Sequence, residues 1–144
     1  MSYQHVLCAV DLSDDNLAVA VRAAELARHD NARLSLIHVV EYVPIDLANE
    51  LVLPHQQEIE EQLLKRAKKL LGELAGEMGL DEVSEIIVSG QTRSEIIQFA
   101  RDHEVDLIVM GKHRKHGIFS ILGSTANGVL HHAPCDILIV HIGE

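Results

Sequence analysis

Short apolar runs recur along the chain and alternate with longer segments in which apolar residues return every three or four positions. The runs are rich in valine, isoleucine and leucine, which is typical of strands buried on both faces. They predict five strands, over residues 5–10, 33–40, 83–88, 105–110 and 136–142. Strand alternating with helix favours a doubly wound α/β fold, in which right-handed crossovers place helices on both faces of a parallel sheet.

The segments between the runs predict four helices, three of which have a clear apolar face. In the first helix the residues expected to point inward are Leu17, Ala20, Val21, Ala24 and Ala27. In the second helix they are Ile59, Leu63, Ala67, Leu70, Leu74 and Met78. In the fourth helix, which starts at Ser124 and stops before Pro134, they are Ala126, Val129, Leu130 and Ala133.

The third helix is expected to begin with a capping box. Thr92 and Glu95 are three residues apart, so the hydroxyl and the carboxylate can each cap a free amide. Residues 41–54 fit neither period, contain two prolines and are longer than the usual connection. We expect them to form a functional flap or a mobile loop.

Length and charge narrow the classes of protein that fit. A chain of 144 residues is long enough for one core and short for two, so we expect a single domain over residues 1–144. The net charge of −10 disfavours binding to nucleic acid or to anionic membranes, so any anion site must be local. No apolar run approaches a bilayer span and no signal-peptide pattern is present, so we expect a cytoplasmic protein. Cys8 and Cys135 have no metal or redox spacing and are expected to be buried thiols.

The candidate binding residues follow the predicted strands. Ligands of open α/β sheets lie outside the carboxyl ends of the strands, where neighbouring connections diverge to opposite faces. The segments concerned are 9–13, 39–41, 111–117 and 123–125. The candidate set is Ala9, Val10, Asp11, Val39, Val40, Met110, Gly111, Lys112, His113, Arg114, Gly123, Ser124 and Thr125.

The loop before the last helix has the features of a phosphate site. No aspartate or glutamate occurs over residues 107–135, although the chain is acidic, whereas Lys112, Arg114 and Lys115 lie there. Gly123 and Ser124 stand at a helix start, where free amides and the helix dipole favour an anion. Ordinary turn and capping chemistry explains the glycine and serine equally well. Asp11 likewise has two interpretations, as a ribose ligand or as a helix cap.

Histidines are numerous, yet their pattern does not favour a metal. His113 and His116 have a ligand-like spacing without an accompanying cysteine or carboxylate. His131 and His132 are adjacent and point in different directions on a helix. One helix carries acidic residues followed by basic ones in an i, i+4 pattern that is typical of a solvated helix face. They are Glu58, Glu60 and Glu61, then Lys65, Arg66, Lys68 and Lys69. We expect neither a metal site nor a catalytic residue.

Four stretches of sequence resemble the universal stress protein family. The run Val-Met-Gly-Lys-His-Arg-Lys-His-Gly-Ile-Phe-Ser-Ile-Leu-Gly-Ser-Thr, followed by Ala-Pro-Cys-Asp-Ile-Leu-Ile-Val, is similar to the family's C-terminal signature. Ala-Val-Asp-Leu-Ser and Ala-Arg-Leu-Ser-Leu-Ile-His-Val resemble its first two strands. The resemblance covers nearly the whole chain. It implies a Rossmann-like sheet in the order 3-2-1-4-5, a homodimer, and ATP, ADP or AMP bound in many members.

The resemblance also implies roles for individual residues. Asp11 would hold the ribose, and Val10 and Val40 would border the adenine. The phosphates would be surrounded by Gly111, His113, Arg114, Gly123, Ser124 and Thr125. The resemblance leaves open whether Mg²⁺ binds together with the phosphates. Arg114 stands where the nucleotide-binding branch has its second glycine, so it either crowds the phosphates or binds one through its guanidinium.

Together these observations predict that the protein is a cytoplasmic stress-response regulator, which binds an adenine nucleotide and dimerises through its last strand. The alternative is a dimeric interaction protein of the universal stress protein A branch that binds no nucleotide. ATP hydrolysis has less support because no Walker-loop lysine is present. The chain lacks the aspartate that a phosphorelay receiver has after its third strand. It also has only 3% aromatic residues, whereas a flavodoxin-like carrier needs aromatic residues to stack on its flavin. The sequence does not identify the protein partner.

Overall fold

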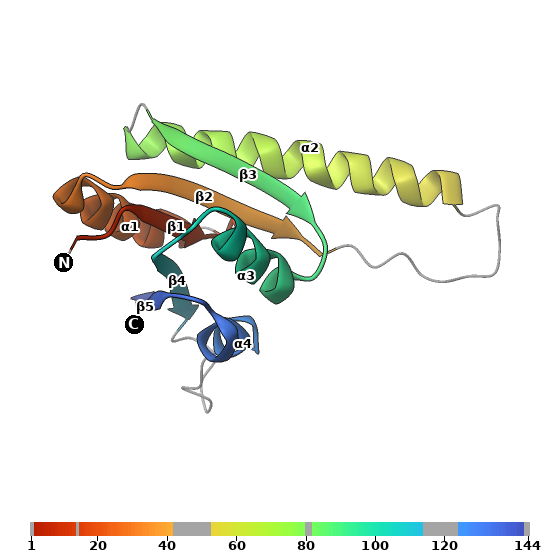
Figure 1. Ribbon diagram of the computed structural model, residues 1–144. Helices are drawn as coiled ribbons and strands as arrows, with labels where there is room; N and C mark the ends of the chain where they lie inside the picture. The colour runs from red at the N-terminus through yellow and green to blue at the C-terminus, as the bar shows by residue number, and fades with distance from the viewer. Residues whose placement is uncertain (1, 14, 42–52, 80–81, 114–123, 143–144) are drawn as a thin grey trace.

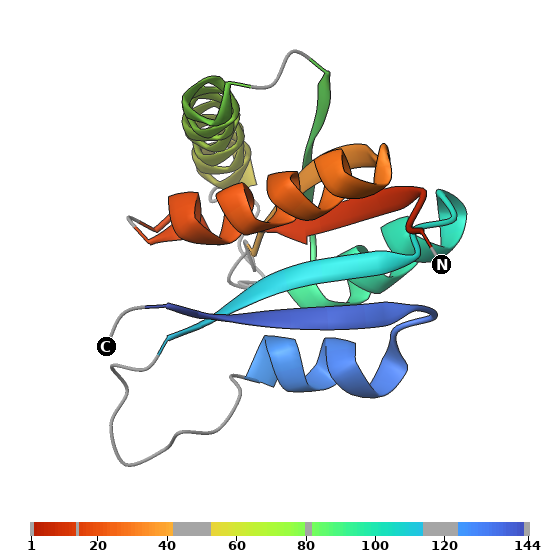
Figure 2. The same ribbon diagram turned by 90° about the vertical axis from the view of Figure 1, so that its left-hand side faces the viewer.

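The computed structural model describes residues 2–13, 15–41, 53–79, 82–113 and 124–142. Five parallel strands form one sheet in the order β3-β2-β1-β4-β5, which confirms the predicted doubly wound fold. The strands are β1 (His5–Ala9), β2 (Arg33–Val40), β3 (Val83–Ser89), β4 (Leu107–His113) and β5 (Asp136–Ile142). The helices are α1 (Asn16–Asp30), α2 (Leu53–Met78), α3 (Thr92–Asp102) and α4 (Ser124–His132). Figures 1 and 2 show α1 and α2 on one face and α3 and α4 on the other.

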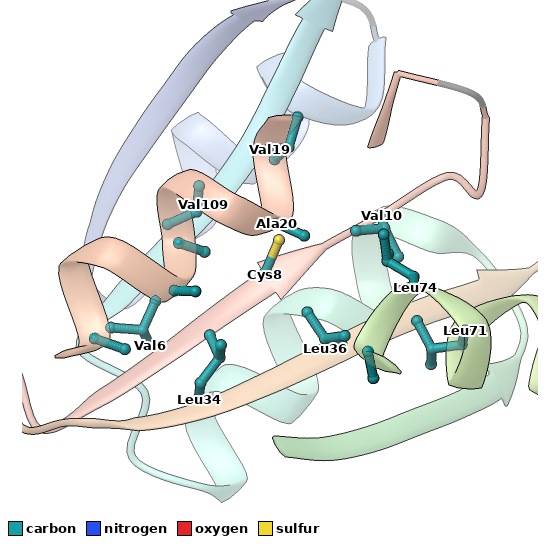
Figure 3. Close-up of a cluster of buried hydrophobic side chains, with 14 of the residues drawn as sticks. Val6, Cys8, Val10, Val19, Ala20, Leu34, Leu36, Leu71, Leu74 and Val109 are labelled. Atoms are coloured by element: carbon teal, nitrogen blue, oxygen red, sulfur yellow. The ribbon is translucent and has the colours of Figure 1, made fainter. Parts of the chain in front are cut away.

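Two hydrophobic clusters hold the helices to the sheet, one on each face. Val6 and Cys8 of β1 point to the α1 and α2 side, where they meet Val109 of β4 (Figure 3). Leu7 of β1 and Ile108 of β4 point the other way, to α3 and α4. Because successive residues of a strand alternate between faces, the continuous apolar runs fill both clusters. The central strands are therefore the most buried part of the molecule.

The inward face of α1 differs from the prediction. Ala20, Ala24 and Ala27 are buried as predicted, but Leu17 and Val21 are 38% and 40% exposed. The helix buries Val19 and Ala23 in their place. Alanines let the helix axis approach the sheet closely, and the larger side chains then lie at the margin. Asn16, a polar residue, is buried beside the exposed Leu17.

The predicted apolar face of α2 is only half covered. Ala67 and Leu74 are buried, whereas Ile59 and Leu63 are 46% and 38% exposed. The helix has 26 residues, which is about 39 Å of length, while a strand of 8 residues such as β2 spans about 26 Å. The amino-terminal part of α2 therefore extends beyond the ends of β2 and β3, as Figure 1 shows. The prediction for α4 fails in the same way at one position, because Leu130 is 47% exposed.

The predicted capping box of α3 is wrong. Thr92 is the first residue of the helix, Gln91 is its N-cap, and Gln91 makes no side-chain capping bond. The free amide of Thr92 donates instead to the carboxylate of Glu41, at 2.9 Å. Hydrogen bonding with Thr92 lowers the pKa of Glu41. A residue at the end of β2 thus caps a helix that begins fifty-one positions later.

Most of the predicted flap lies outside the described residues. Glu41 and Leu53 border residues 42–52, of which the structure describes nothing. Helix α2 begins at Leu53, so Pro54 belongs to its first turn and not to a loop. A proline is well suited to that position, where its missing N–H has no helical partner.

Polar contacts join the elements at the amino end of the sheet, and one of them, between His5 and Ser35, is buried. His5 and Ser35 are 4% and 3% exposed, with His5 Nε2 2.8 Å from Ser35 Oγ. His5 Nδ1 lies 3.0 Å from the carbonyl oxygen of His103, and since a carbonyl only accepts, Nδ1 is the donor. Asp106 accepts hydrogen bonds from the amides of Gln4 and His5. These bonds join β1 to β2 and to the end of α3, far from the candidate ligand site.

The two cysteines are not paired with each other. Cys8 is fully buried, as predicted, and burial raises the pKa of its thiol to about 12. Cys135 is only half-buried, which corrects the prediction, and desolvation raises its pKa to about 11. Both thiols are therefore protonated and unreactive near neutral pH.

Candidate functional site

The candidate site lies where β1 and β4 end side by side. Cys8 of β1 pairs with Val109 of β4, so the residues that follow, Asp11 and Gly111, belong to neighbouring chain segments. The chain leaves β1 for α1 on one face of the sheet, and β4 leads to α4 on the opposite face (Figure 2). This divergence is the switch point at which α/β sheets bind their ligands.

A buried asparagine holds the turn that carries Asp11. The Asp11 amide donates to Asn16 Oδ1 at 3.0 Å, and Asn16 Nδ2 contacts Asp11 Oδ1 in return. The same Nδ2 lies 2.7 Å from Ser13 Oγ and 3.2 Å from its carbonyl oxygen. Leu12, inside the turn, has a φ of 62°, which is costly for a residue with a side chain. The turn is thus held in an unfavourable conformation by bonds that orient the Asp11 carboxylate.

Asp11 does not cap α1. The N-cap residue is Asp15, which makes no side-chain capping bond. Asp11 Oδ1 accepts a hydrogen bond from the Ser13 amide at 2.9 Å, in addition to its contact with Asn16. The side chain of Asp11 is exposed at the edge of the sheet. Asp11 therefore is not the N-cap residue, although it bonds Ser13 and Asn16 at the start of α1.

The valines at the ends of β1 and β2 are buried, and backbone groups of Val10 and Val40 are hydrogen-bonded. Val10, Val39 and Val40 are 6%, 6% and 7% exposed, and Ala9 is partly buried. The Val10 amide donates to the carbonyl of Ile37 at 3.0 Å. The Val10 carbonyl accepts from His38 Nδ1 at 2.8 Å, and the Val40 carbonyl accepts from the Gly90 amide at 3.1 Å.

Strand β4 is longer than predicted and includes Gly111, Lys112 and His113. These residues were expected to follow the strand, but β5 extends alongside and pairs with each of them, Gly111 with Val140. Met110 is buried in the cluster under α3 and α4, and Lys112 is half-buried.

Packing alone requires a glycine at position 111. A β-carbon there would lie 2.8 Å from Val19 Cγ2 and would also overlap Ile142 Cδ1. Both contacts belong to the cluster under α1. The glycine therefore has a structural reason that is independent of any ligand.

The predicted phosphate loop is described only at its two ends. His113 is the last residue of β4, and Ser124 is the first residue of α4, which matches the predicted helix start. Thr125 is half-buried in the first turn. Arg114 and Gly123 lie outside the described residues, as does His116. No group of three or more metal-binding side chains gathers among the described residues, and no described helix is long and apolar enough to cross a membrane.

Sequence and structure comparisons place the chain among known proteins. The model of the universal stress protein family matches residues 2–141. Universal stress protein A homolog 1 of Coxiella burnetii is 38% identical over 100% of both chains. Universal stress protein A of Escherichia coli K12 is 30% identical over 100% of this chain and 98% of its own. The solved structure of universal stress protein UspA from Lactobacillus plantarum has a TM-score of 0.83 at 25% identity, covering 97% of this chain and 99% of its own.

Two solved relatives that share the fold contain a nucleotide. A universal stress protein in complex with cAMP has a TM-score of 0.64 at 22% identity and covers 98% of both chains. The universal stress protein from Archaeoglobus fulgidus in complex with dAMP has a TM-score of 0.63 at 20% identity, over 99% of this chain and 100% of its own. With the fold, the family model and the relatives in agreement, the chain belongs to the universal stress protein family.

Proposed function

We propose that this protein binds an adenine nucleotide, ATP or AMP, at the carboxyl ends of β1 and β4 and acts as a cytoplasmic stress-response regulator. The observation that carries the proposal is the Asp11 carboxylate, which Asn16 and Ser13 hold in place at the switch point of the sheet. Fixed carboxylate oxygens are suited to accept hydrogen bonds from ribose hydroxyls. The cAMP and dAMP complexes of two relatives lend support.

The other candidate residues take their places around Asp11 in this proposal. Ala9, Val10, Val39 and Val40 would border the adenine, and Met110, Gly111 and Lys112 would lie under the ribose and phosphates. The phosphates would be bound by His113, Arg114, Gly123, Ser124 and Thr125. We assign no protein ligand to Mg²⁺, which would enter with the phosphates, and no catalytic residue.

Titration calorimetry with ATP, AMP and adenosine tests the proposal. The parent protein is expected to bind ATP, and Gly123→Val is expected to abolish binding because its side chain would push the phosphate from the amides at the start of α4. Arg114→Ala should weaken the binding of ATP about tenfold or more, because a charge-assisted hydrogen bond to a phosphate is lost. The affinity for adenosine should not change.

Arg101→Ala serves as the control, because Arg101 is an exposed arginine near the end of α3. Tighter ATP binding by Arg114→Ala would identify the arginine as an obstruction. A parent protein that binds no nucleotide would favour the alternative, a dimeric interaction protein of the universal stress protein A branch. One observation already favours that alternative, since packing alone explains Gly111.

We further propose a homodimer through β5, which is an edge strand with half-buried apolar side chains. Pairing two copies of the strand about a two-fold axis would close an edge that is otherwise open to aggregation. Val140→Lys and Ile139→Lys should each lower the mass in sedimentation velocity to half that of the parent, because they place a charge in the β5 contact. Leu130→Lys, on an exposed position of α4, is the control. A Val140→Lys protein that folds and sediments like the parent would refute this interface.

A further inference from the structure

The outer face of α1 and α2 carries most of the exposed apolar side chains in the described part of the chain. Large hydrophobic residues are exposed at Leu17 and Val21 on α1, at Ile59 and Leu63 on α2, and elsewhere at Leu130. Leu17 lies against α2, since it lines a hollow together with Leu70 and Leu74. The apolar residues of the two helices thus belong to one continuous surface.

Two hollows along α2 differ in charge. The first, of about 490 Å³, lies toward the amino end of the helix and contains three cations and no acid. Its lining residues are Ile59, Gln62, Leu63, Lys65, Arg66 and Lys69. The second, of about 200 Å³, lies toward the carboxyl end and contains two acids and no cation. It is lined by Leu12, Ser13, Asn16, Leu17, Leu70, Glu73, Leu74 and Glu77.

Four of the five charged residues of the two hollows share one face of α2. Positions 62, 66, 69, 73 and 77 are three or four residues apart, which places them one above another along a helix. From residue 66 to residue 77 the face is therefore first basic and then acidic, and Glu58, four residues before Gln62, adds an acid at its amino end. Neither Arg66 nor Glu73 forms an ion pair with any residue that the structure describes. Lys69 precedes Glu73 by four, which is the weaker order for an intrahelical pair.

We propose that this face binds a second copy of the same chain, with the two α2 helices antiparallel about a two-fold axis. With the axis between residues 69 and 70, Arg66 of each copy faces Glu73 of the other, and Gln62 faces Glu77. The basic part of each face then meets the acidic part of the other.

A second copy suits this surface better than a foreign partner. A face with both signs of charge in opposite halves is complementary to itself when it is turned by 180°. An acidic peptide would match only the basic half and would be repelled by Glu73 and Glu77. The net charge of −10 likewise disfavours a polyanion. The proposal does not depend on nucleotide binding, and it concerns a surface separate from β5.

Reciprocal charge reversal provides the test. Arg66→Glu with Lys69→Glu makes both halves acidic, and Glu73→Lys with Glu77→Lys makes both basic. Each double variant alone should show at least about a hundredfold weaker association, because like charges then face each other. In sedimentation velocity the parent should have at least twice the mass of either variant. An equimolar mixture of the two variants should restore the parent's mass, since an all-acidic face then meets an all-basic one.

A matched control is Lys68→Glu with Arg101→Glu, which changes the net charge equally at exposed positions outside both hollows. This control should keep the parent's mass. Leu63→Ser, which removes an apolar contact without a change of charge, should also lower the mass, and circular dichroism should confirm that each variant folds. A parent that already has the mass of the variants, or a mixture that fails to restore it, would overturn the second copy as the occupant.

Discussion

Gly111→Val is expected to lower the free energy of unfolding by about 1–3 kcal/mol, in the absence of any ligand. The glycine lies in β4 with Val19 of α1 and Ile142 of β5 directly above it. A valine would have to displace both side chains within a cluster that has no space to receive them. Equilibrium unfolding in urea, followed by circular dichroism, measures the change.

Gly76→Ala is the matched control for this prediction. Gly76 lies inside α2, and a β-carbon there would have no neighbour within 4 Å. This substitution should raise stability by about 0.5–1 kcal/mol, the usual gain from replacing a helical glycine with alanine. If Gly111→Val were as stable as the parent but bound no nucleotide, the glycine would be needed to make room for a ligand and not for core packing.

The sheet could be predicted from the sequence because apolar runs identify strands buried on both faces. The end of β4 could not, because Lys112 and His113 are polar and look like loop residues. Their strand conformation comes from β5, which pairs Lys112 with His141 and His113 with Ile142. Such pairing depends on a segment more than twenty residues later in the chain.

Helical periodicity identified an apolar stripe on α2 but not the extent of its coverage. Ala67 lies on the sheet, while Ile59 lies past the end of it, and both belong to the same stripe. The difference follows from the unequal lengths of helix and strand, which no local pattern records. On α1, alanines replace the larger residues at the interface because they permit closer packing, so hydrophobicity pointed to Leu17 in error.

The candidate site shows a similar division between local and long-range signals. Asp11 was found because it directly follows a strand, which is a local signal. Asn16 was missed because a polar residue at a helix start is ordinarily an exposed cap. The link between Glu41 and Thr92 was also missed, since it joins segments that only the folded sheet brings together. Asn16 is buried and the neighbouring Leu17 is exposed, which is the reverse of what their polarity suggests. This reversal is visible only in the structure.

Asn16→Ala is expected to destabilise the protein by about 1–3 kcal/mol and to weaken ATP about tenfold. The Asn16 amide bonds the Asp11 amide, the Asp11 carboxylate and Ser13 from a site that is 4% exposed. Its loss removes one hydrogen bond from each of these groups and loosens a turn in which Leu12 is strained. Gln98→Ala, which removes an exposed amide bonded to Asp102 on α3, should change stability by less than about 0.5 kcal/mol.

A comparison of ATP with 2′,3′-dideoxy-ATP separates the orientation of Asp11 from general damage to the site. In the parent, loss of the ribose hydroxyls should reduce affinity, because the fixed Asp11 carboxylate loses the groups that it binds. In Asn16→Ala the carboxylate keeps its bond from the Ser13 amide but loses the one from Asn16, so it is held less firmly. The same loss of hydroxyls should then cost clearly less, which is the signature of coupling in a double-mutant cycle. Calorimetry on the four combinations measures the coupling. An equal penalty in both proteins would mean that Asn16 supports the turn without directing Asp11 to a ligand, while its effect on unfolding would still stand.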